Sequence, residues 1–195
     1  LGKFSINIHH VPLHRDFGKR LATVLQLLLC KSHYLPLTVD NLNKMHFIPK
    51  KDYTANRLVS GLLQLSNHTH LILDETAMDE GQLNQDGVQN LTAIGHLISW
   101  QKCQYNFSFH NIEFETDVPC LVLSDGRSLL PNDCQVMMNT TEVASPTVID
   151  QAFSTIGQEL NESFLSTLRK YLTVVRHLDY NLQDAAQEAV QKDFV

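Results

Sequence analysis

Apolar and polar positions alternate or recur in patterns that divide the chain into strands and helices. Residues 3–8 alternate strictly, which predicts a strand with one buried face. Compact apolar runs predict strands at 69–73 and 120–123, and shorter ones at 37–39 and 135–138. The alternation across 105–114 predicts a strand or one arm of a hairpin.

Apolar residues at helical spacing predict helices between these strands. Helices are expected to begin near Asp16, Asp40, Asp52 and Asp86. A linker rich in Asn, Thr, Ser and Pro is expected at 139–146, and an apolar stripe from Leu160 to Val175 then predicts an all-helical segment. This order predicts an α/β fold with a mostly parallel sheet. We expect an α/β domain over 1–145 and a helical segment over 146–195.

Composition and charge exclude some classes of function. The chain has 195 residues, 43% of them hydrophobic, and a formal charge of -6 at pH 7. An acidic protein is unsuited to holding DNA by bulk charge, because nonspecific affinity comes mainly from Lys and Arg on phosphates. No apolar run approaches the roughly 20 residues that span a bilayer.

Glycosylation sequons support a further hypothesis, a secreted glycoprotein. Five sequons begin at Asn67, Asn90, Asn106, Asn139 and Asn161. The N-terminus does not read as a signal peptide, and the missing start Met suggests a fragment of a longer chain. We therefore expect ordinary polar residues at the sequons. The four cysteines contain no C-x-x-C pair, and we expect reduced, mostly buried thiols.

The most informative local motif is Leu71-Ile72-Leu73-Asp74-Glu75. An apolar strand that ends in Asp-Glu is the Walker-B arrangement of P-loop NTPases, in which Asp holds Mg²⁺ and Glu polarises the attacking water. The same five residues would also occur in a strand that simply ends in an acidic turn and has no role in binding or catalysis. No G-x-x-x-x-G-K-[ST] occurs in the chain, so we expect any phosphate-binding loop to lie upstream of Leu1. The histidine groups lack the spacing of a metal site, and no metal is expected.

The order of parts after this motif resembles the AAA+ domain of minichromosome maintenance (MCM) helicase subunits. Those subunits carry Walker B, a hairpin, sensor 1, an arginine finger and a helical lid in that order. The corresponding segments here are 71–75, 101–114, 120–125, 129–133 and the helical stretch near 168. The resemblance implies a degenerate AAA+, P-loop NTPase-like fold followed by the start of a helical lid over 146–195.

A closer resemblance is to the MCM-binding protein family. It is carried by residues 51–65 (KDYTANRLVSGLLQL), by Asp74-Glu75-Thr76 with Gly81-Gln82-Leu83, and by 126–135. Over essentially its whole length the chain resembles the C-terminal half of those longer proteins. The family implies a nuclear, non-catalytic partner of MCM helicase subunits. The resemblance also implies roles in MCM complex assembly and unloading during DNA replication, and in sister-chromatid cohesion.

Departures from a working helicase support the non-catalytic reading. Asn132 stands at the arginine-finger position, and loss of that arginine typically costs a factor of about 10³–10⁵ in rate. Ser124 and Asp125 stand near the sensor-1 position, where an acidic group would repel a γ-phosphate. We expect Asp74 and Glu75 to be vestigial, with no cofactor, no nucleic acid and no membrane as partners. The alternative is an active or conditionally active AAA+ ATPase.

Overall fold

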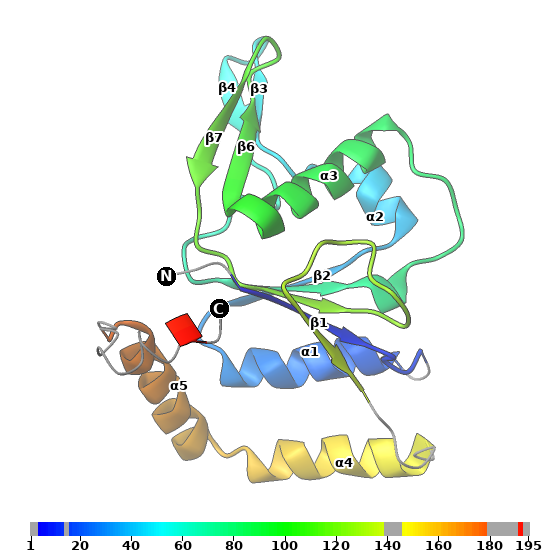
Figure 1. Ribbon diagram of the computed structural model, residues 1–195, viewed down its shortest axis with the longest axis vertical. Coiled ribbons are helices and arrows are strands. Elements are labelled where there is room, and N and C mark those ends of the chain that lie inside the picture. The colour runs from blue at the N-terminus through cyan, green and yellow to red at the C-terminus, as the bar shows by residue number, and fades with distance from the viewer. Residues whose placement is uncertain (1–3, 14–15, 139–145, 179–190, 193–195) are drawn as a thin grey trace.

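A parallel sheet lies at the centre of the molecule (Figure 1). The computed structural model describes residues 4–13, 16–138, 146–178 and 191–192. Within them, five parallel strands pair in the order β2-β5-β8-β1-β9. Their bounds are β1 (Ser5–His9), β2 (Ser32–Pro36), β5 (His70–Asp74), β8 (Cys120–Leu123) and β9 (Cys134–Met137). The predicted α/β class with a mostly parallel sheet is confirmed.

Helices cover both faces of this sheet and add a further layer (Figure 1). The helix α1 (Phe17–Leu28) lies on one face, and α2 (Val39–Lys44) and α3 (Gln85–Trp100) lie on the other. The helices α4 (Pro146–Glu159) and α5 (Glu162–Arg176) pack against α1 on its far side. Arg20 Nη1 bonds Asp150 Oδ1 at 2.6 Å, and Arg169 donates from Nε and Nη2 to the Leu27 carbonyl at 3.0 and 2.5 Å.

The core lies on both faces of the central strands. Successive residues of a strand point to opposite faces. Leu71 and Leu73 therefore belong to the larger apolar cluster, which includes residues of α2 and α3, whereas Ile72 packs with Ala22 of α1. This two-sided burial explains why β5 and β8 appear in the sequence as continuous apolar runs.

A second, smaller sheet projects beyond α3 (Figure 1). Among the described residues it contains four strands in the order β4-β3-β6-β7. They are β3 (Lys50–Asp52), β4 (Arg57–Val59), β6 (Lys102–Asn106) and β7 (Asn111–Glu115). The antiparallel β6–β7 pair confirms the hairpin that the resemblance implied at 101–114. The single strand or arm expected across 105–114 is wrong, because the chain turns between Asn106 and Asn111, and Phe109 at the tip is 88% exposed.

The helix expected after Asp52 is wrong, because β3 and β4 form a hairpin there. The Asp52 carboxylate accepts hydrogen bonds from the backbone N–H groups of Thr54 and Ala55, at 2.9 and 3.1 Å. Asn56 then takes a left-handed conformation with φ of 47°. Side chains of Asp and Asn favour such turns, which outweighed the helical spacing of the leucines that follow.

Two other boundaries differ from the sequence-based expectations. The strand expected at 37–39 is instead Ser32–Pro36, and Val39 already belongs to α2, whose first turn is capped by the Thr38 hydroxyl. The stripe from Leu160 to Val175 does not lie on one helix. The chain breaks at Leu160 and restarts at α5, where the Asn161 side chain accepts from Phe164 N at 2.9 Å. Most of the expected linker, 139–145, lies outside the described residues.

The state of the cysteines and the length of the helices test two further expectations from the sequence. All four cysteines are free thiols. Cys103 and Cys120 are buried, as expected, and burial raises the pKa of Cys120 to about 12. Cys134 is partly buried and Cys30 is exposed. In the described part of the chain, no helix has both the length and the apolar character needed to cross a membrane.

Candidate functional site at the carboxyl ends of the strands

The site begins where β5 delivers Asp74 and Glu75 at its carboxyl end. This strand lies between β2 and β8, with Asp74 opposite Pro36 on one side and Leu123 on the other. Ligands of open α/β sheets bind outside the carboxyl ends of the strands. The acidic pair therefore lies at the carboxyl-terminal edge of the sheet, where ligand binding is expected.

Asp74 is almost fully enclosed, with 2% of its surface exposed. Its carboxylate accepts hydrogen bonds from the Tyr34 hydroxyl at 2.7 Å, from Thr76 N at 3.0 Å and from Thr76 Oγ1 at 2.5 Å. Burial, followed by the bond to Asp74, raises the pKa of Tyr34 far above its ordinary value. Both carboxylate oxygens therefore have partners within the protein. Direct contact with Mg²⁺ would require this enclosure to open, because only 2% of Asp74 is exposed.

The first turn of α1 packs directly against this carboxylate. A Cβ atom added to Gly18 would lie 2.8 Å from Asp74 Oδ2 and 2.9 Å from Thr76 Oγ1. Only glycine fits such an approach without a shift of its neighbours. The amino end of a helix favours a negative charge, and here Asp74 supplies that charge from within the chain.

Glu75 fastens a neighbouring segment to the site. Its carboxylate accepts from Ser128 Oγ at 2.8 Å and from Leu129 N at 3.2 Å to each oxygen. Burial raises the pKa of Glu75, and the bonds from Ser128 and Leu129 offset part of that rise. A general base needs a lone pair directed at a water molecule. The Glu75 lone pairs instead hold the start of segment 128–133.

Ser124 and Asp125, which the resemblance leads us to expect near the sensor-1 position, follow directly after β8. The buried Ser124 hydroxyl accepts from Asn7 Nδ2 at 2.9 Å and donates to the Gly126 carbonyl at 2.8 Å. The Asp125 carbonyl accepts from His10 N at 2.9 Å. These bonds join the carboxyl ends of β8 and β1. The two residues therefore lie on the same edge of the sheet as Asp74.

Asn132, which the resemblance leads us to expect at the arginine-finger position, lies in segment 128–133. Its Nδ2 donates to the Leu130 carbonyl at 3.2 Å, a local bond within the segment. Leu130 is buried, and Asp133 Oδ2 accepts from Ser5 N and Oγ at 2.9 and 2.8 Å. The segment is thus anchored at both ends, by Glu75 and by β1, with Leu129 exposed between the anchors.

Three residues that decide the character of this site were missed from the sequence. They are Gly18, Tyr34 and Ser128, and each comes from a different element or loop. Gly18 and Tyr34 belong to no recognisable motif. Ser128 lies in segment 126–135, which carries the family resemblance, but nothing in that segment indicates a bond to Glu75. Among the described residues, no three His, Cys, Asp or Glu side chains converge as metal ligands. The arrangement as it stands cross-links the sheet edge rather than presenting open carboxylates.

Comparison with known proteins gives a full-length match to one family. A family model described as "Mini-chromosome maintenance replisome factor" matches residues 1–195. A mouse protein is 45% identical over 195 residues, and a human protein is 43% identical over the same length. A Drosophila melanogaster protein is 40% identical over 196 residues. All three carry the name mini-chromosome maintenance complex-binding protein.

The matches cover all of this chain and only part of each relative. The chain spans 30% of the mouse and human proteins and 32% of the Drosophila protein. The resemblance seen in the sequence, carried by residues 51–65 and by the segments around Asp74 and 126–135, is therefore confirmed along the whole chain. This chain belongs to the mini-chromosome maintenance replisome factor family.

Proposed function

We propose that this region is a non-catalytic, AAA+-like domain that binds subunits of the MCM helicase. The observation that carries the proposal is the match of the whole chain to part of relatives that are named for binding the MCM complex. The non-catalytic part is supported by Asp74 and Glu75, because both carboxylates are held by internal hydrogen bonds. The family also suggests a nuclear protein that acts in MCM assembly and unloading and in cohesion.

The strand order supports the AAA+-like part of this proposal. Counted along the chain as 1 to 5, the strands β1, β2, β5, β8 and β9 lie across the sheet as 5-1-4-3-2. AAA+ ATPases share this order, with the phosphate-binding loop after strand 1 and Walker B on strand 3. The helices α4 and α5 would then be the start of the lid, after a core over 1–145.

The same order suggests another place for the phosphate-binding loop than upstream of Leu1. By analogy, the connection between β1 and α1, which the structure describes at residues 10–13 and 16, takes the position of that loop. The sequence over 10–16, HVPLHRD, contains no glycine and no Gly-Lys-Ser/Thr. Glycine lets the backbone N–H groups of a P-loop approach the phosphates closely. This supports a domain that has kept the architecture of an ATPase without its phosphate cradle.

The purified chain is expected not to bind Mg-ATP. Gly18 at the start of α1 is packed against Asp74, and no P-loop sequence is present to hold the phosphates. Isothermal titration of the chain with Mg-ATP should give no binding heat, while a P-loop ATPase titrated in parallel does. A dissociation constant in the micromolar range would contradict the proposal and favour the alternative, a conditionally active ATPase.

MCM binding should depend on this region. We expect the purified chain to capture at least one MCM subunit when each is presented singly, without DNA. We also expect a full-length relative that lacks the region matching 1–195 to lose most of its MCM binding. Full binding by the truncated relative would show that another part of the protein makes the contact.

A further inference from the structure

The strand β1 is apolar on one face and polar on the other. Ile8 packs with residues of α1, and alternation along the strand turns Asn7 and His9 to the opposite face of the sheet. Asn7 is 1% exposed, and its Nδ2 donates to the Ser124 hydroxyl at 2.9 Å and to the Val122 carbonyl at 3.4 Å. A buried amide is costly unless it is hydrogen-bonded, so these bonds fix its orientation. The sheet therefore holds a polar surface at a position where a core residue usually stands.

A cavity of about 450 Å³ lies over this polar face. It is lined by Asn7, His9, His10, Arg127 and Gln135, and we call it the β1 pocket. Asn7 and Gln135 are register partners on the parallel strands β1 and β9, so their side chains lie on the same face. The volume is within the range of small-molecule binding sites. All five lining residues are polar or basic, and none is acidic.

Backbone hydrogen bonds hold the loop after β8 against the end of β1. His10 N donates to the Asp125 carbonyl at 2.9 Å, and Val11 N donates to the Ser124 carbonyl at 3.0 Å. His10 has a left-handed conformation with φ of 61°, which histidine adopts more readily than most residues. Arg127 follows two residues after Asp125. The fold itself therefore brings this arginine to the β1 pocket.

The two histidines supply a hydrogen-bond donor in any neutral tautomer. Their Nδ1 atoms lie 2.5 Å apart, so one ring donates and the other accepts. A neutral ring that accepts at Nδ1 carries its proton on Nε2. Whichever ring accepts, one Nε2–H group is left over, and within the described residues neither Nε2 has a partner. His9 and His10 both line the β1 pocket, so this donor is available to a ligand there.

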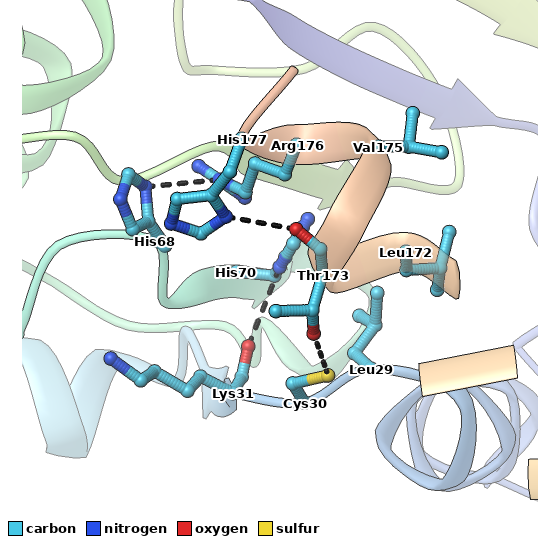
Figure 2. Close-up of a pocket in the computed structure, with 10 residues that line it drawn as sticks. All are labelled: Leu29, Cys30, Lys31, His68, His70, Leu172, Thr173, Val175, Arg176 and His177. Atoms are coloured by element: carbon cyan, nitrogen blue, oxygen red, sulfur yellow. Dashed lines mark hydrogen bonds between the residues drawn. The ribbon is translucent and has the colours of Figure 1, made fainter. Parts of the chain in front are cut away.

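Arg127 gives the β1 pocket a cation that the protein does not use elsewhere. Among the described residues, neither its guanidinium nor the side-chain amide of Gln135 has a hydrogen-bond or ion-pair partner. A second cavity, of about 440 Å³ beside the end of α5, differs in this respect (Figure 2). There Arg176 donates to His68 Nδ1 at 2.9 Å and to Asp117 Oδ1 at 3.2 Å. Of these two cavities, only the β1 pocket offers an unpaired guanidinium.

We propose that the β1 pocket binds a phosphate group. The guanidinium of Arg127 presents several N–H donors in a planar fork, which matches the oxygen atoms of a phosphate. The imidazole N–H and the Gln135 amide approach from β1 and β9, whereas Arg127 comes from the loop after β8. Donors from three segments suit a tetrahedral group better than a planar carboxylate. The pocket volume accommodates more than a phosphate alone, so we expect a phosphate monoester carried on a larger molecule.

This pocket differs from the phosphate site of an ATPase. A P-loop binds phosphates through backbone N–H groups, whereas the donors here are side chains. The strand β8 separates β1 from β5, which carries Asp74, and no carboxylate lines the pocket to hold Mg²⁺. A few side-chain bonds at an open site support a dissociation constant of about 1–10 mM for free phosphate. The inference is independent of MCM binding, and the absence of micromolar Mg-ATP binding is still expected.

Titration of the ¹⁵N-labelled chain with sodium phosphate, at constant ionic strength, tests the proposal by NMR. The amide signals of His9, His10, Arg127 and Gln135 should shift and saturate in the millimolar range. Arg127→Ala should weaken binding at least about tenfold, because it removes the charged fork from an exposed loop. Arg57→Ala removes an exposed arginine of β4 on the second sheet and should bind phosphate as the unchanged chain does.

Three results would overturn the proposal. They are the absence of a saturable shift at these amides, equal binding by Arg127→Ala, and shifts that fall equally on Arg57 and other exposed cations. Acetate at the same ionic strength should bind at least about fivefold more weakly than phosphate. Equal binding of acetate would overturn the assignment to phosphate. Thermal unfolding of both variants should match that of the unchanged chain.

Two further probes identify what carries the phosphate. One is a short peptide with a single phosphoserine, and the other is ribose 5-phosphate, each compared with its unphosphorylated form. The true carrier should bind more tightly than inorganic phosphate and lose that affinity in Arg127→Ala. Equal binding of the unphosphorylated forms would overturn the phosphate site. If neither probe exceeds inorganic phosphate, the expected carrier is wrong and the free ion is the ligand.

Discussion

Replacing Asp74 with alanine is expected to lower the free energy of unfolding by about 2–4 kcal/mol. The substitution leaves the Tyr34 hydroxyl and two donors of Thr76 without their acceptor. Each buried donor left without a partner costs about 1–3 kcal/mol, and relaxation or water entry recovers part of the sum. Urea denaturation followed by circular dichroism measures the change. Asp74 is thereby predicted to act as a structural residue of the sheet edge.

Two companion variants make this result specific. Asp74→Asn keeps the size of the side chain and one oxygen acceptor, so its loss of stability should be smaller than that of the alanine variant. Asp125→Ala, on the same edge and exposed, should change stability by less than about 0.5 kcal/mol. A residue kept only for catalysis tends to cost stability, so its removal is neutral or stabilising. A stable Asp74→Ala variant would therefore contradict the structural role.

Replacing Glu75 with alanine is expected to cost about 1–3 kcal/mol, because Ser128 Oγ and Leu129 N lose their acceptor. Glu75→Gln should cost less, since the amide keeps one oxygen and removes the partly buried charge. The hydrogen-exchange rate of the Leu129 amide, measured by NMR, should rise more in Glu75→Ala than in Glu75→Gln. Equal protection of this amide in all three proteins would show that Glu75 does not hold segment 128–133.

The difference in stability between the unchanged chain and Glu75→Gln is expected to depend on pH, with a defined sign. Burial raises the pKa of Glu75 in the folded state above its unfolded value, so the charged form is the less favourable one in the fold. The stabilising contribution of protonated Glu75 is present below the unfolded pKa and is lost as pH rises through the folded pKa. As the pH is lowered from about 7 to about 4, the unchanged chain should therefore gain stability relative to Glu75→Gln. The opposite slope would contradict the burial argument.

Glu75→Gln also tests the alternative of an active ATPase. In an AAA+ enzyme the change removes the group that polarises water, so ATP stays bound and the ATP-dependent assembly persists. Here Glu75 is held by Ser128 and Leu129, and MCM binding should be the same with and without ATP. An ATP-dependent gain in MCM capture by Glu75→Gln would favour the enzyme.

The sequence predicted best those elements whose own residues form a distinctive apolar pattern. The run at 69–73 and the run at 120–123 are continuous and apolar, because β5 and β8 are covered on both faces. The helix beginning near Asp86 is long enough for its periodicity to be distinctive, and it appears as α3. The family was also readable from the sequence, because residues 51–65 are specific to it.

The secondary-structure predictions were wrong where one segment of sequence was compatible with two structures, or where a strand carried no apolar pattern. Leu58, Leu62 and Leu65 satisfy helical spacing, yet the turn made by Asp52 and Asn56 pairs Leu58 with Lys51 across a hairpin. A strand at 32–36 was not expected, since Ser32 and His33 are polar. It is stabilised by pairing with β5, which lies 38 residues along the chain.

The sequence alone determined that an acidic pair ends a buried strand and that this chain resembles MCM-binding proteins. Only the tertiary structure decided what the pair does. Asp74 meets Tyr34 across 40 residues, and Glu75 meets Ser128 across 53 residues. Likewise, the packing of α5 on α1 decided which of its apolar residues remain exposed. The physical reason is that hydrogen-bond partners and burial depend on which elements lie side by side, and that is set by the whole sheet rather than by neighbours in the chain.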